Sequence, residues 1–66
     1  PVLLVHGSAD DVVPPSWSTR LRDALEKGGH KVRLDQPKGV DHLGVYNPDV
    51  SGPLILDWLR GLSGPP

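Results

Sequence analysis

Two residues of this chain, the carboxylate of Asp10 and the imidazole of His42, have side chains that could do acid–base chemistry together. A carboxylate that accepts a hydrogen bond from one imidazole nitrogen fixes the tautomer of the ring. It also stabilises the imidazolium that forms when the other nitrogen takes up a proton. Such a pair is the base and orienting half of a nucleophile–base–orienter triad. It works only if the fold brings the two side chains together.

The elements around these residues can be read from the hydrophobic pattern. Residues 2–5 are four consecutive apolar residues, which indicates a strand covered on both faces. Ser16 is the expected N-cap of a helix that follows it, and the pair Gly28-Gly29 is expected to end that helix. Residues 31–35 alternate between polar and apolar, which predicts a second strand with one buried face.

A second helix is expected from about Ser51 or Gly52 to Leu62, with Pro53 tolerated in its first turn and a glycine- and proline-rich tail up to Pro66 closing it. The element order is therefore β-α-β-α, and the fold class is α/β. Two strands joined through a helix should be parallel, with a right-handed crossover. Functional loops gather at the carboxyl ends of parallel strands. We therefore expect the side chains of Asp10 and His42 on one rim of the sheet, either within hydrogen-bond reach of each other or bridged by one water.

The first 14 residues resemble the segment of α/β-hydrolases that carries the triad acid: an apolar strand, then Gly-x-x-Asp-x-x-Val-Pro. Matching the pattern residue by residue places the acid on Asp10, three after Gly7, and not on Asp11. The family histidine usually follows the next strand in a Gly-x-x-His context, which residues 39–42 match. The resemblance covers nearly the whole chain and looks most like the secretory-lipase and general esterase branches.

This resemblance implies a Ser–Asp–His order along the chain, with the serine in a Gly-x-Ser-x-Gly turn. The sequence contains no such turn, and it starts on Pro1 with no methionine anywhere. We therefore expect a cut, processed or engineered piece of a longer protein, whose nucleophile and oxyanion hole lie before Pro1. Residues 1–66 would form a single partial domain, the C-terminal segment that bears the acid and the base.

Several alternatives for individual residues stay open. Asp11 and Asp41 are the other candidates for the carboxylate, although Asp41 is adjacent to His42 and would generally point away from it. His6 is expected to have a structural role in the turn after the first strand. Ser8 is expected to be a turn residue that bonds its own backbone. The set of His6, Asp10 and His42 leaves a metal site as a remote alternative, but its spacing matches no metal motif.

Composition excludes several classes of function. Seven basic and eight acidic residues give a net charge of −1 with no basic stripe, which argues against nucleic-acid binding. The chain has no cysteine and no apolar run long enough for a membrane span. No cofactor or metal is expected. A 66-residue unit has a marginal core, so the rest of a hydrolase or a homo-oligomer should cover the open edge of the sheet.

The function predicted from the sequence is a carboxylic-ester hydrolase, an esterase or lipase acting on a small-molecule ester, with Asp10 as the acid and His42 as the base. One alternative is a non-enzymatic fragment that folds by self-association. Another is a minimal esterase with residual activity, in which His42 acts as base or direct nucleophile. Peptidases of the α/β-hydrolase fold share this C-terminal pattern, so the substrate class extrapolates from the resemblance.

Overall fold

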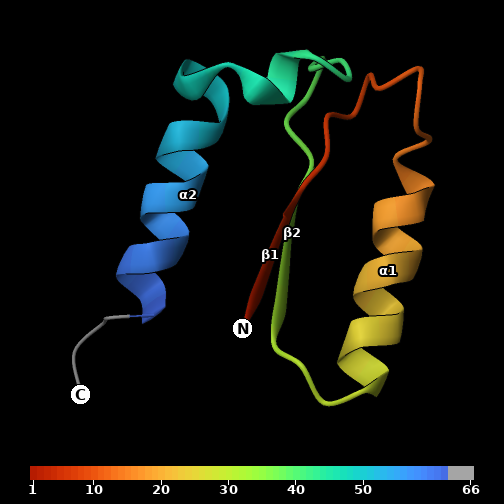
Figure 1. Cartoon of the computed structure of the whole chain (residues 1–66), viewed down its shortest axis with the longest axis vertical. Coiled ribbons are helices and arrows are strands. Elements are labelled where there is room, and N and C mark those ends of the chain that lie inside the picture. The colour runs from red at the N-terminus through yellow and green to blue at the C-terminus, as the bar shows by residue number, and fades with distance from the viewer. Residues whose placement is uncertain (63–66) are drawn as a thin grey trace.

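Two parallel strands lie at the centre of the computed structural model, which describes residues 1–62 (Figure 1). Strand β1 covers Val2–Val5 and strand β2 covers Val32–Asp35. The strands pair in parallel over their whole length. The ladder continues by one bond at its carboxyl end, where the His6 amide donates to the Asp35 carbonyl at 3.0 Å. The loops that follow the two strands therefore leave the sheet on the same rim.

Helix α1 spans Ser16–Lys27 and connects the two strands. The prediction that Ser16 caps this helix is wrong: Ser16 is its first residue, and Pro15 holds the cap position without a side-chain hydrogen bond. The ring of Pro15 holds φ near its helical value, here −56°, so the first turn begins one residue early. Gly29 ends the turn after the helix with a φ of 89°, a value that only glycine adopts at little cost.

Helix α2 covers Pro48–Leu62 and begins three to four residues earlier than predicted. Asn47 caps it, because its Oδ1 accepts the amide of Asp49 at 2.9 Å. Pro48 takes the first helical position, where a missing N–H is harmless. Pro53 consequently lies in the second turn and not in the first. The tail from residue 63 to 66 lies outside the described residues.

The short 3-10 helix η1, Gly44–Tyr46, connects the loop after β2 to α2 and was not predicted. Figure 1 shows α1 and α2 on opposite sides of the strand pair, with the loops and η1 at one end. Helix α1 contacts β2, and helix α2 contacts β1 and η1. Arg33 of β2 also reaches α2, where its Nη1 donates to Asp57 Oδ2 at 2.6 Å. The α/β class and the element order predicted from the sequence are confirmed.

The apolar side chains of this arrangement are only partly covered. Among residues 1–62 no hydrophobic side chain is buried, and both strands are half-buried along their length. Large apolar residues on both helices stay open to solvent; Trp17 is 58% and Leu56 is 54% exposed. The buried residues in the described part of the chain are instead His6 and Gly7, at the rim of the sheet.

Candidate active site

The loop after β1 and the loop after β2 run against each other at the rim of the sheet. The amide of Ala9 donates to the Val40 carbonyl at 3.0 Å, and the amide of Ser8 donates to the Pro37 carbonyl at 3.0 Å. Gly7 permits this approach, because a Cβ at that position would stand 2.0 Å from the Val40 carbonyl oxygen. Backbone contacts between the loops therefore fix the distance between the segments that carry Asp10 and His42.

Ser8 strengthens the same junction in an unexpected way. Its hydroxyl accepts the amide of Gly39 at 2.8 Å, from the other loop. The prediction that Ser8 bonds its own backbone is wrong, because its hydroxyl binds an amide of the second loop. Gly39 has a φ of 75°, a value that a residue with a side chain rarely adopts.

The Asp10 carboxylate is held on both of its oxygens. Oδ1 accepts the backbone amides of Val12 at 2.9 Å and Val13 at 2.8 Å. Oδ2 accepts from His42 Nδ1 at 2.9 Å and lies 3.1 Å from His6 Nε2. The side chain of Asp10 is only 5% exposed. Three N–H groups thus hydrogen-bond to this carboxylate, and the His6 ring nitrogen lies close to the oxygen that faces His42.

These contacts set the protonation state of Asp10. Burial acts to raise the pKa of the carboxyl, but the hydrogen bonds from Val13, His42 and Val12 outweigh it, and the attraction of the His42 ring adds to them. Together they lower the pKa of Asp10 from 3.8 to about 2. The carboxylate is therefore ionised at neutral pH, as an orienting acid must be.

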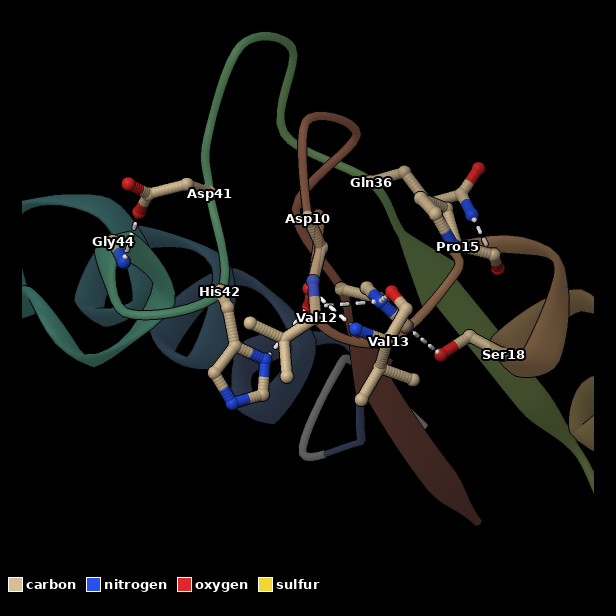
Figure 2. Close-up of polar contacts among 10 residues, drawn as sticks. Asp10, Val12, Val13, Pro15, Ser18, Gln36, Asp41, His42 and Gly44 are labelled. Atoms are coloured by element: carbon tan, nitrogen blue, oxygen red, sulfur yellow. Dashed lines mark hydrogen bonds and ion pairs between the residues drawn. The ribbon is translucent and has the colours of Figure 1, made fainter.

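The tautomer of His42 follows from its partner. The atom facing Nδ1 is a carboxylate oxygen, which can only accept, so Nδ1 carries a proton. In the neutral ring Nε2 is then unprotonated and free to take a proton from a third group. Figure 2 shows Nε2 on the side of the ring away from Asp10, and within residues 1–62 it has no hydrogen-bond partner. The side chain is 35% exposed.

The other carboxylates do not take this place. Asp41 turns away from His42 and accepts the amide of Gly44, the first residue of η1, at 2.7 Å (Figure 2). Asp11 is exposed and lies within the turn that Asp10 closes with the Val12 and Val13 amides. A cavity of about 200 Å³ opens beside Asp10 and His42, which both line it. Its other walls include Val13, Val45 and Tyr46.

His6 does more than the structural role in the turn that the sequence predicts. Its Nε2 donates to the Val13 carbonyl at 2.8 Å, and its Nδ1 pairs with the Ser18 hydroxyl at the start of α1. The additional approach to Asp10 was not predicted from the sequence. Its only sequence signal is the spacing of four residues between His6 and Asp10.

Two other kinds of site can be checked against the described part of the chain. In residues 1–62, no group of three or more His, Cys, Asp or Glu side chains has the arrangement that holds a metal ion. None of the helices there is long and apolar enough to cross a membrane.

With this geometry in place, comparison with known families is informative. Residues 1–60 match the model of the prolyl oligopeptidase family. The chain belongs to that family. No curated protein and no solved structure matches the chain.

Membership corrects one expectation and supports another. The prolyl oligopeptidase family consists of serine peptidases with the α/β-hydrolase fold, so the resemblance to an α/β-hydrolase-type serine hydrolase is confirmed. The assignment to the secretory-lipase branch is wrong, since the match is to a peptidase family. The segment Gly7 to Pro14 cannot separate these branches, because it encodes the acid-bearing turn that they share.

Proposed function

We propose that this chain supplies the acid, Asp10, and the base, His42, of the catalytic triad of a serine hydrolase. The observation that carries the proposal is the 2.9 Å hydrogen bond from His42 Nδ1 to an ionised, enclosed Asp10 carboxylate. The rest of the triad, a serine in a Gly-x-Ser-x-Gly turn, comes from another part of the protein, because this sequence has no such turn.

In the proposed reaction, the serine hydroxyl attacks the carbonyl carbon of the substrate while His42 Nε2 takes up the hydroxyl proton. The imidazolium that forms is stabilised by Asp10 through the Nδ1–H bond. His42 then donates the proton to the leaving amine or alcohol, which leaves an acyl-enzyme. Water then attacks the acyl-enzyme while His42 takes up its proton, and His42 returns that proton to the serine as the carboxylic acid product leaves.

The substrate is proposed to be a peptide, on the strength of the family match over residues 1–60. A carboxylic ester, the substrate expected from the sequence, is retained as the second class, because the same acid and base serve both. Matched peptide-anilide and ester substrates with the same acyl group distinguish the two in the intact protein. A peptidase should hydrolyse the anilide as well as the intrinsically more reactive ester, whereas an esterase should lose almost all of its activity on the anilide.

The decisive test is His42→Ala in the intact protein. We expect a loss of about 10⁴-fold or more in kcat, because the serine loses its base. His30→Ala is the matched control, since His30 is exposed at the far end of the sheet and should leave the rate unchanged. Full activity in His42→Ala would refute the proposal.

A second candidate concerns the isolated chain. The His42 ring is 35% exposed and can act through Nε2 as a base or direct nucleophile on activated aryl esters without a serine. We expect this rate to be low and to vanish in His42→Ala but to survive Ser8→Ala, because the Ser8 hydroxyl is occupied by the Gly39 amide. Activity lost in Ser8→Ala and kept in His42→Ala would reverse these roles.

A further inference from the structure

His6 contacts the turn of residues 10–13, here called the Asp10 turn, at two points. Its Nε2 donates to the carbonyl of Val13, the residue whose amide binds Asp10 Oδ1, and the same nitrogen lies 3.1 Å from Asp10 Oδ2. The His6 side chain is 9% exposed, and the Asp10 side chain is 5% exposed. An enclosed contact of this kind is weakened little by solvent. One imidazole therefore contacts both the carboxylate and the turn that holds it.

The orientation of the His6 ring is fixed at its other end. Both groups facing Nε2, a carbonyl and a carboxylate, only accept hydrogen bonds, so Nε2 must carry a proton. Nδ1 faces the Ser18 hydroxyl, which can donate to a neutral ring or accept from a charged one. Either way, Ser18 holds the ring with its Nε2–H directed at the Asp10 turn.

We propose that His6, oriented by Ser18, is a positioning residue that holds the Asp10 carboxylate in the direction of His42. The inference rests on the proposed function, because Asp10 must act on His42 for its direction to matter. Asp10 Oδ2 lies between the imidazoles of His42 and His6. In the proposed reaction His42 takes up and releases a proton, whereas His6 only positions the carboxylate. The effect is moderate, since two backbone amides still hold Oδ1 when His6 is removed.

Two substitutions separate the two ends of the His6 ring. A glutamine amide can place an N–H where Nε2 is, whereas an asparagine amide reaches only the position of Nδ1. We expect His6→Gln to keep kcat within about threefold of wild type and His6→Asn to lower kcat about tenfold with KM little changed, about the size of one hydrogen bond. If His6 served only to tether the loop after β1 to α1 through Nδ1, His6→Asn would be more active than His6→Gln. That result would overturn the proposal.

A double-mutant cycle then tests whether His6 acts through Asp10. In the Asp10→Asn background, His6→Asn should change the remaining rate by less than about threefold, because the carboxylate that His6 positions is gone. A full tenfold loss in both backgrounds would overturn the proposal. If Asp10→Asn alone left the intact protein fully active, the proposed function itself would fail, so the two failures are distinguishable.

Ser18→Ala repeats the test without altering the ring, in case His6→Asn does not fold. We expect it to lower kcat about threefold, and to have no effect in the Asp10→Asn background. Ser16→Ala is its matched control, because Ser16 lies in the same turn of α1 and makes no capping hydrogen bond. Equal rates for Ser18→Ala and wild type, with both proteins folded by thermal unfolding, would overturn the role of Ser18.

Discussion

The rim of the sheet and the layer between the sheet and its helices are built in opposite ways. At the rim, two loops are joined by backbone and side-chain hydrogen bonds, and the His6 and Asp10 side chains are almost fully enclosed. In the layer, the strands are half-buried and apolar side chains such as Trp17 and Leu56 are more than half exposed. The polar site is thus enclosed, whereas the apolar layer is open.

This difference separates what orients the site from what stabilises the fold. Hydrogen bonds are directional, so a few of them set the distance between Asp10 and His42. Net stability comes mainly from apolar area removed from water, about 25 cal/mol per Å², and here much of that area stays exposed. We therefore propose that the apolar layer is completed by another surface, either the rest of a hydrolase or a second copy of the chain.

The largest expected effect belongs to the rim and tests its chemistry without altering its shape. In the intact protein, Asp10→Asn should lower kcat/KM about 10⁴-fold, because an amide can donate to Nδ1 and leave His42 in the wrong tautomer. Asp11→Asn is the matched control, since Asp11 is the neighbouring carboxylate and is exposed. Steady-state kinetics of both variants measure the effect; equal losses would mean that Asp10 has no special role.

The second prediction breaks the rim by steric force. Gly7→Ala places a methyl group 2.0 Å from the Val40 carbonyl oxygen, so the two loops must separate. We expect about a 100-fold loss in kcat and a destabilisation of about 1–3 kcal/mol. Gly61→Ala is the control, because a Cβ there meets nothing within 4 Å and alanine should stabilise α2 by up to about 1 kcal/mol. Kinetics and thermal unfolding of both variants would show whether the close approach at Gly7 matters.

The third prediction concerns the open layer. The chain in isolation should associate at micromolar concentration, because β1 and the helices expose apolar surface and strand β1 has an unpaired edge. Replacing Trp17 and Leu56 together by Gln should shift sedimentation toward the monomer, while replacing Asp11, which is also exposed, by Gln should not. A wild-type monomer with a cooperative thermal transition would show that the layer is sufficient as it stands.

The smallest expected effect is the acid dependence of stability. The pKa of Asp10 falls from 3.8 to about 2 on folding, so its contribution is complete above about pH 4 and is lost as the pH falls toward 2. Wild type should therefore lose more stability than Asp10→Asn between pH 4 and pH 2. Chemical denaturation across this range measures the difference, and parallel curves for the two proteins would contradict the assignment.

The elements of this chain could be read from local sequence because local forces form them. The apolar run of β1 and the Gly28-Gly29 stop after α1 were predicted, and so was the rim on which Asp10 and His42 meet. The start of α2 was missed, although its signal is local: Asn47 caps the helix, and Pro48 fits its first position. The resemblance to α/β-hydrolases was also visible, but the branch was not, because the matching segment encodes a turn that both branches use.

What only the tertiary structure decided are the contacts between segments distant in the sequence. The sequence around Ser8 does not indicate that its hydroxyl binds the Gly39 amide, and the sequence around His6 does not indicate that Ser18 fixes its ring. Nor does the pattern around Asp10 show that two imidazoles share one carboxylate oxygen. Hydrogen bonds of this kind require the donor–acceptor distance to be correct to within a few tenths of an ångström. That distance is set by how the two loops pack together and not by the residues of either loop alone.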